Sequence, residues 1–146
     1  MGFSMRINFV DVICDDSLKN IFTNGKKTGY QFSIRLSYYR GHFLSDIEQF
    51  EVYMDGEKVE DKDILFGING KQFTVSQLGK CVTEFWTLLE PAKISVIKDG
   101  GLPSGEHDVR VVLYLRIPYL PLPGSNEGEH KYMPADSCGE KKLTIA

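Results

Sequence analysis

Histidine, cysteine and carboxylate side chains are the groups in this sequence that could carry out acid–base, nucleophilic or metal chemistry. The three histidines and three cysteines are widely spaced and form no ligand motif or C-x-x-C pair: His42, His107, His130, Cys14, Cys81 and Cys138. That spacing indicates neither a zinc site nor a disulfide framework. The sequence also lacks the G-x-S-x-G, P-loop and G-x-G-x-x-G motifs. We therefore expect no catalytic residues and no metal site in this chain.

The segment of residues 38–43, with the sequence YYRGHF, is rich in the residue types that bind partners. Tyrosine and arginine provide large contact areas that end in polar groups, and they dominate the energetics of protein interfaces. The glycine between Arg40 and His42 allows a sharp turn that would project both side chains from a strand end. We expect Tyr38, Tyr39, Arg40 and His42 to lie at a subunit contact or at the rim of a substrate pocket. The alternative is that the aromatic rings cap the end of the fold.

Trp86 and His107 are added to this candidate site. Trp86 is the sole tryptophan and follows Glu84 and Phe85, a combination that suits stacking against a sugar ring. A single tryptophan in a β-sandwich is also a common core residue. An isolated histidine such as His107 is commonly a surface or turn residue. From the sequence alone, both interpretations stay open for each side chain.

Alternation of apolar and polar residues predicts the strands that must position these side chains. Residues 30–38 and 108–119 place every second, apolar side chain on one face, which is the pattern of a half-buried β-strand. The core residues expected from these two segments are Phe32, Ile34, Leu36, Val109, Val111, Leu113 and Leu115. Weaker alternation predicts strands at residues 6–12, 18–23, 50–54, 64–68, 71–75, 84–88, 92–97 and 141–145, and residues 76–80 suit a short helical turn.

Turn residues separate the predicted strands and leave one irregular region near the C-terminus. Three hairpins are expected because a type I′ turn needs positive φ at both central residues: Asn24-Gly25, Asp55-Gly56 and Asn69-Gly70. Many short strands with frequent turns predict a single antiparallel β-sandwich over residues 1–146, immunoglobulin-like or jelly-roll-like. Residues 124–139 are expected to form an irregular C-terminal loop that is flexible or contacts a partner.

The composition argues against several classes of partner. The chain has 146 residues, of which 42% are hydrophobic and 25% charged, so it can build a packed core without disulfides or metals. A net charge of −3 argues against nucleic acid or an anionic membrane surface as a partner. No apolar stretch reaches the length of a membrane-spanning helix. Because the thiols form no framework and no secretory signal is evident, we expect a cytoplasmic location.

An ordered series of short motifs resembles the small β subunit of bacterial C-glycoside deglycosidases. The likeness extends from about residue 16 to residue 123, and the strand expected at residues 141–145 fits the end of the family. It rests on the order and spacing of many motifs: DSLKN at 16–20, GYQF at 29–32, YYRG at 38–41, VYMDGEKV at 52–59, EPA at 90–92, GGL at 100–102, GEH at 105–107 and LRIPY at 115–119.

The resemblance implies a non-catalytic subunit of a carbon–carbon lyase complex. In such enzymes the larger α subunit is similar to a TIM-barrel sugar isomerase, holds a divalent metal, usually manganese, and supplies the acid–base residues. The substrate is a C-glycoside of a flavonoid or related phenolic whose glucose has already been oxidised to the 3-oxo sugar. The resemblance further implies that this chain is a β-sandwich near the mouth of the α subunit's active site, with no cofactor of its own and no activity alone.

Two other function classes also fit the residues. A free-standing carbohydrate-binding module would bind glycans by itself, whereas a purely structural immunoglobulin-like module would affect no catalysis. Cleavage of a carbon–carbon bond needs an electron sink such as a ketone and an acid that protonates the leaving carbon. Because the sequence offers no clustered metal ligands, a partner would have to manage that chemistry. Co-purification with a metal-binding barrel subunit would distinguish the first class from the other two.

Overall fold

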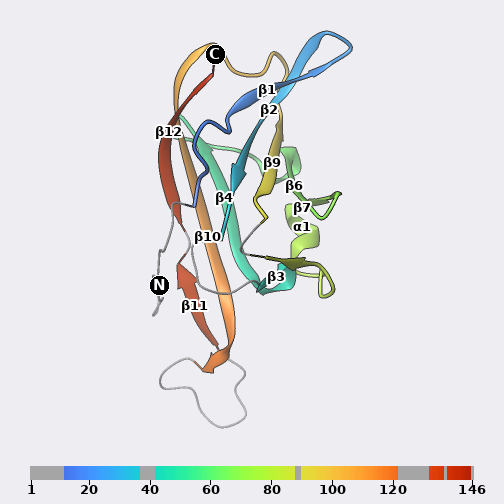
Figure 1. The fold of residues 1–146 in the computed structure, drawn as a ribbon, viewed down its shortest axis with the longest axis vertical. Coiled ribbons are helices and arrows are strands. Elements are labelled where there is room, and N and C mark those ends of the chain that lie inside the picture. The colour runs from blue at the N-terminus through green and yellow to red at the C-terminus, as the bar shows by residue number, and fades with distance from the viewer. Residues whose placement is uncertain (1–11, 37–41, 88–89, 122–131, 137, 146) are drawn as a thin grey trace.

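The computed structural model describes residues 12–36, 42–87, 90–121, 132–136 and 138–145. Within these ranges the chain forms two five-stranded antiparallel sheets and a small two-stranded ribbon (Figure 1). The prediction of an antiparallel β-sandwich is confirmed. The described helices have three or four residues each, far fewer than a helix needs to cross a membrane.

The first sheet is built around the middle strands β2, β9 and β6. Its strands, in spatial order, are β1 (Lys19–Thr23), β2 (Lys26–Ile34), β9 (Ala92–Ile97), β6 (Ile64–Ile68) and β7 (Lys71–Thr74). Alternation turns one face of the middle strands inward. In one row across them, Phe32 pairs with Ile94, which in turn pairs with Phe66, and all three side chains are fully buried.

The second sheet is organised by β10 (Gly105–Pro121), the longest strand. On one side it pairs with β4 (Ile47–Met54), which carries β5 (Glu57–Lys58) at the sheet edge. On its other side lie β11 (Tyr132–Asp136) and β12 (Gly139–Ile145). All seven core residues predicted from alternation are buried: Phe32, Ile34, Leu36, Val109, Val111, Leu113 and Leu115.

The three predicted tight hairpins are all present. Each has two residues between its strands, and both residues have positive φ: Asn24 and Gly25, Asp55 and Gly56, Asn69 and Gly70. They join β1 to β2, β4 to β5 and β6 to β7. Because the first turn is at Asn24 and Gly25, β2 begins at Lys26 rather than at Tyr30, where alternation predicted its start. Of the strand predicted at residues 6–12, all but Val12 lies outside the described residues.

The segment predicted as an irregular C-terminal loop, residues 124–139, contains one strand, and its predicted flexibility or contact with a partner stays a prediction. Tyr132–Asp136 forms β11 and Gly139 begins β12, whereas residues 122–131 and 137 lie outside the described residues. The two strands keep one register along β10 as far as the pair of Arg116 with Pro134. The prediction rested on the Gly, Ser, Glu and Asp residues that are frequent in this segment, a composition typical of loops. Pro134 also lies within β11. β11 is an edge strand, and an edge is where a sheet tolerates proline.

A short two-stranded ribbon lies outside both large sheets. It consists of β3 (His42–Phe43) and β8 (Phe85–Trp86), and β3 continues into the 3₁₀ turn η1 (Leu44–Asp46). The remaining helical elements are η2 (Asp61–Asp63) and α1 (Val75–Leu78), close to the helical turn expected at residues 76–80. Trp86 packs edge-on against Phe66, with ring centroids 5.3 Å apart, and so fixes the ribbon to the core.

Replacing Phe66 by alanine should destabilise the fold strongly. Its ring is fully buried and also makes an edge-on contact with Phe50 across the two sheets, at 5.5 Å between centroids. The free energy of unfolding should fall by about 3–5 kcal/mol, the usual result of truncating a buried phenylalanine. Urea denaturation followed by circular dichroism measures the change.

Phe22→Ala is the matched control, because Phe22 is 61% exposed and its truncation should change stability by less than about 0.5 kcal/mol. Equal effects of both substitutions would contradict this account of the core.

Candidate functional site

The predicted site residues are distributed over both ends of the sandwich. Tyr38, Tyr39 and Arg40 lie outside the described residues. β3 and β8 place His42 directly opposite Trp86, although the two residues are distant in sequence. His107 lies near the start of β10, where β10 pairs with the end of β12, at the opposite end of the molecule from β3 (Figure 1). The structure therefore groups His42 with Trp86 and separates His107 from both.

Trp86 is a core residue within this chain. Its side chain is fully buried, and its indole N–H donates a hydrogen bond of 2.8 Å to the carbonyl of Glu90. A buried tryptophan normally satisfies its N–H in this way. The indole ring is therefore not available in the isolated chain as an open platform for stacking. The prediction that Trp86 borders a subunit contact stays a prediction.

Two exposed aromatic rings lie beside Trp86 on the same ribbon. Phe43 and Phe85 face each other across β3 and β8 with centroids 4.9 Å apart, yet they are 43% and 40% exposed. Val82 is 65% exposed. It lies between Cys81 and Glu84, whose backbone carbonyls accept hydrogen bonds from the N–H groups of Ser45 and Leu44 in η1. We call Phe43, Val82 and Phe85 the aromatic end. Exposed apolar groups that gather in this way are typical of interaction surfaces.

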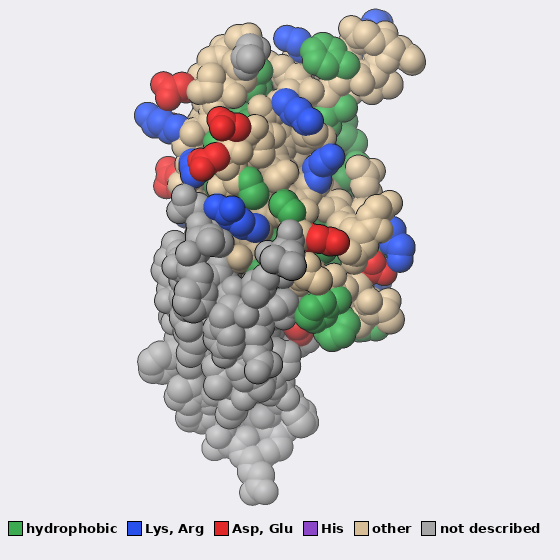
Figure 2. Space-filling view, in the orientation of Figure 1, with side chains coloured by type: hydrophobic (Ala, Val, Ile, Leu, Met, Phe, Trp, Pro, Cys, Tyr) green, Lys and Arg blue, Asp and Glu red, His purple; other side chains and the backbone are tan. Residues whose placement is uncertain are grey.

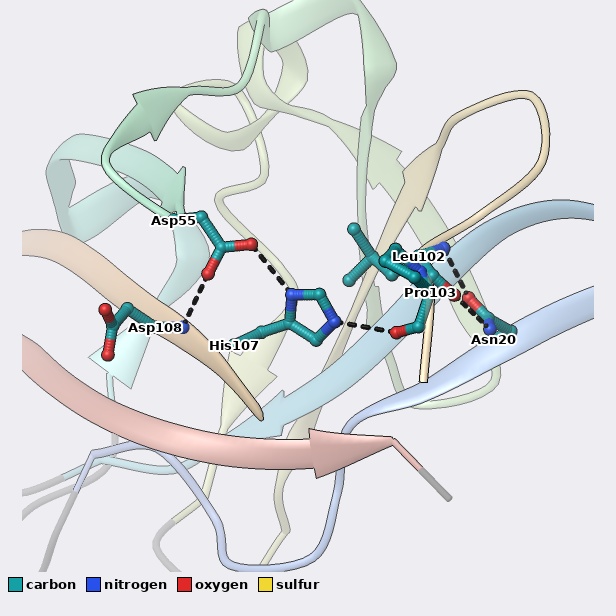
Figure 3. Close-up of polar contacts among 6 residues, drawn as sticks. All are labelled: Asn20, Asp55, Leu102, Pro103, His107 and Asp108. Carbon is teal, nitrogen blue, oxygen red and sulfur yellow. Dashed lines mark hydrogen bonds and ion pairs between the residues drawn. The ribbon is translucent and has the colours of Figure 1, made fainter. Parts of the chain in front are cut away.

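A buried histidine organises the opposite end of the sandwich. His107 is 7% exposed, and its Nδ1 lies 2.7 Å from Oδ2 of Asp55 in the β4–β5 turn. Its Nε2 lies 2.8 Å from the carbonyl oxygen of Pro103 (Figure 3). The other carboxylate oxygen of Asp55 accepts the backbone N–H of Asp108, also at 2.8 Å. One histidine thereby ties the turn after β4 to the loop before β10.

Both ring nitrogens of His107 face hydrogen-bond acceptors, so both must donate, which only the protonated imidazolium can do. Burial opposes the charged ring most strongly. The hydrogen bonds to Asp55 and to the Pro103 carbonyl, with the charge of Asp55, outweigh burial and raise the pKa of His107 above its usual 6.5. The hydrogen bond from His107 in turn lowers the pKa of the Asp55 carboxyl. The geometry and both shifts therefore favour an ion pair between the two side chains below the raised pKa of His107.

The loop before β10 is also held from its other side. The side chain of Asn20 donates to the carbonyl of Leu102 and accepts from the Leu102 N–H, both at 2.8 Å (Figure 3). Gly101 has φ +58°, and a Cβ at this position would lie 2.5 Å from Oδ1 of Asn20. A glycine is therefore required here both for the backbone conformation and for the close approach of Asn20. Asn20 and His107 clamp the loop between them.

The hydrogen bonds of His107 stabilise the fold and leave neither ring nitrogen free for acid–base catalysis. A catalytic His–Asp pair leaves its second ring nitrogen facing the reacting group, whereas Nε2 of His107 is bonded to Pro103. Among the residues that the structure describes, no three His, Cys, Asp or Glu side chains gather to hold a metal ion. Cys81 packs against the core at half-burial. At this end of the molecule the described side chains form hydrogen bonds that hold the β4–β5 turn and the loop before β10 in place.

Sequence reasoning identified His107 but not its partners. Asp55 was recognised as a turn residue, although its carboxylate also pairs with His107 and caps the N–H of Asp108. Asn20 and the exposed pair of Phe43 with Phe85 were also missed. The strand alternation that turns Trp86 inward implies that Phe85 faces outward, which is the signal that was available.

Replacing His107 by glutamine should destabilise the chain in a pH-dependent way. The raised pKa of His107 means that its contribution is fully present below pH 6.5 and is lost as the pH rises through that raised pKa. The lowered pKa of Asp55 means that its contribution is present above pH 3.8 and is lost at lower pH. The stability difference between wild type and variant should therefore be largest between these values and should shrink toward alkaline pH.

Urea unfolding from about pH 5 to about pH 9 measures this difference. Asp55→Asn should reproduce the effect, and the double variant should cost less than the sum of the two single variants because the groups interact. Glu106→Gln is the control, since Glu106 is the exposed neighbour of His107 on β10. A constant difference across the whole pH range would mean that the ion pair is absent.

Comparison with known proteins gives a consistent family. The profile of the C-glycoside deglycosidase beta subunit family matches residues 9–119. The chain is 37% identical over 98 residues, 67% of each protein, to a "C-glycoside deglycosidase beta subunit" of Eubacterium cellulosolvens. It is 30% identical over 113 residues to a "3'-dehydrocarminate deglycosidase beta subunit" of a Microbacterium species, which covers 77% of this chain and 81% of that protein. A third relative, a "C-glycoside deglycosidase beta subunit" of Arthrobacter globiformis, is 24% identical over 119 residues, 81% of this chain and 86% of that protein. The family match includes Asn20, Asp55 and His107 and ends within β10. We conclude that this chain belongs to the C-glycoside deglycosidase beta subunit family.

Proposed function

We propose that this chain is the non-catalytic β subunit of a heteromeric C-glycoside deglycosidase in the cytoplasm. The complex would cleave the carbon–carbon glycosidic bond of 3-oxo-glucosyl flavonoids and related phenolics. The observation that carries the proposal is the family match over residues 9–119, which includes every strand from β1 to β9. The name of the Microbacterium relative includes a 3'-dehydro compound, which supports an oxidised sugar as the substrate.

The proposal divides the chemistry between two subunits. Cleavage begins when a base removes a proton beside the 3-oxo carbonyl, after which elimination releases the aglycone and an acid protonates its carbon. A divalent metal, which we propose to be manganese, would stabilise negative charge on the sugar oxygens. His107 and Asp55 are engaged with each other and with the chain's own backbone. We therefore assign the metal and the acid–base residues to a larger, TIM-barrel α subunit.

The aromatic end is the proposed contact with that subunit. Phe43 and Phe85 are each at least 40% exposed, and removing aromatic area from water contributes about 25 cal/mol per Å² of apolar surface. Tyr38, Tyr39 and Arg40 are separated from β3 in the sequence only by Gly41, so the residues predicted for an interface are close in sequence to the aromatic end. Aromatic residues and arginine are enriched at the centre of interfaces. The same residues would also suit the rim of the substrate pocket.

The purified chain should have no deglycosidase activity by itself. Because the proposal places the metal and acid–base groups in the partner, the chain alone should release no aglycone from a 3-oxo C-glucoside. It should also show no stoichiometric tight site for Mn²⁺. Liquid chromatography of the aglycone and calorimetric titration with Mn²⁺ measure the two properties, with the co-expressed complex as the positive control. Turnover by the chain alone, or a tight one-to-one manganese site, would overturn this division.

Substitutions at the aromatic end should weaken assembly without unfolding the chain. Phe85→Ala and Arg40→Ala should each lower the affinity for the α subunit by about fivefold or more, the effect expected of an interface residue that contributes ~1 kcal/mol or more. Biolayer interferometry with the immobilised α subunit measures this affinity, and circular dichroism checks folding. Phe22→Ala is the matched control, because Phe22 is an exposed phenylalanine on β1, at the far end of the sandwich from β3 (Figure 1). If all three variants bind like wild type, the aromatic end is not the contact.

A further inference from the structure

A cavity of about 520 Å³ opens between the two sheets beside the His107 cluster. Asp55 and Leu102, which flank His107 in Figure 3, both line it. Its deeper wall consists of core residues, among them Met54 and Val96, and the β4–β5 hairpin and η2 supply its polar rim. The volume is within the range of sites that take small molecules, roughly 300–1,000 Å³.

A buried phenol faces this cavity. Tyr30 points inward from β2 and is 2% exposed. Its hydroxyl forms no hydrogen bond with any residue that the structure describes. Burial, with the charges of Asp55 and Asp63, raises its pKa to about 12, so the phenol stays neutral. Buried tyrosine hydroxyls usually bond to a partner, and a molecule bound in the cavity that Tyr30 lines would supply the missing one.

The charges around the cavity are nearly balanced. Four carboxylates line it, those of Asp55, Glu57, Glu60 and Asp63, together with the ammonium groups of Lys58 and Lys98. Three groups outside the cavity pair with lining side chains: His107 with Asp55, Lys62 with Glu60 at 3.1 Å, and Glu51 with Lys58 at 3.5 Å. With these partners five carboxylates meet four cations, so the rim carries no strong charge of either sign that would select a charged ligand. The carboxylates accept hydrogen bonds and the ammonium groups donate them, so a ligand that does both is satisfied on every side.

We propose that this cavity is a binding site for a neutral, polyhydroxylated small molecule of monosaccharide size. Hydroxyl groups both donate and accept, which matches the mixed carboxylate and ammonium rim and the hydroxyl of Tyr30. The C–H face of such a ring packs against the apolar wall formed by Met54, Val96 and Leu102. The site is separate from the proposed subunit contact, since β3 lies at the other end of the sandwich (Figure 1). Its existence does not depend on the deglycosidase activity of the complex.

The test titrates the isotope-labelled full chain with D-glucose, D-galactose and myo-inositol while its amide resonances are followed by NMR. At least one of these neutral probes should bind saturably with a Kd in the millimolar range, about −4 kcal/mol or tighter, and should shift resonances of Tyr30, Val96 and Leu102. D-glucosamine and D-gluconate, which carry opposite charges, should bind more weakly than the best neutral probe. Tyr30→Phe should weaken binding of that probe by about fivefold or more, because it removes one hydrogen bond and little volume.

Tyr53→Phe is the matched control, since the Tyr53 hydroxyl bonds to Glu51 and the residue is absent from the cavity wall; it should bind like wild type. If Tyr30→Phe fails to fold, Asp63→Ala at the rim replaces it with the same expected loss. Three results would each overturn the proposal. They are no saturable binding of any neutral probe, preference for a charged probe, and equal affinity of wild type and the cavity variants. Subunit assembly is measured separately, so failure of this site leaves the proposed function unaffected.

Discussion

The contacts of the Phe66 ring tie together all three parts of the fold. Phe66 lies on β6 in the first sheet, meets Phe50 on β4 in the second, and meets Trp86 on the small ribbon. Edge-to-face packing is favourable for such rings, and the three together exclude water from the centre of the sandwich. Because Trp86 is held inward, strand alternation sends its neighbour Phe85 outward. The exposed aromatic end is thus a direct consequence of how the core is packed.

Asp55 links separate segments of the chain at the other end of the molecule. It occupies the left-handed position of the β4–β5 turn, with φ +52°. Its carboxylate also pairs with His107 and caps Asp108. Asparagine would suit the turn equally well, so the charge at this position is explained by the histidine rather than by the backbone. The loop before β10 is consequently held firmly although it has no regular secondary structure.

The fold was largely predictable because its signals are local. Alternation located β6 and β9 to the residue, and the Asn-Gly and Asp-Gly pairs located three hairpins by their φ requirement. The limits of sequence reasoning appear where a feature depends on distant residues. The Gly, Ser, Glu and Asp residues of the segment 124–139 hid β11, because only its pairing with β10 shows that part of this segment is a strand. His107 could be named as a candidate, but its pairing with Asp55 and Pro103 arises from tertiary contact. The interface prediction at Tyr38, Tyr39 and Arg40 falls outside the described residues.

The shared register of β11 and β12 along β10 has a consequence for the order of folding. These strands form one hairpin-like unit from a continuous piece of chain, as do β1 with β2, β4 with β5 and β6 with β7. By contrast, the pairings of β2 with β9 and of β4 with β10 join segments that are far apart in sequence. Closing such long loops carries an entropy penalty that must be met before the contacts form, and folding rates fall accordingly. We expect the hairpins to form first and the docking of β4 on β10 to limit the rate, so that the Asp55–His107 pair, which needs both strands in place, forms late.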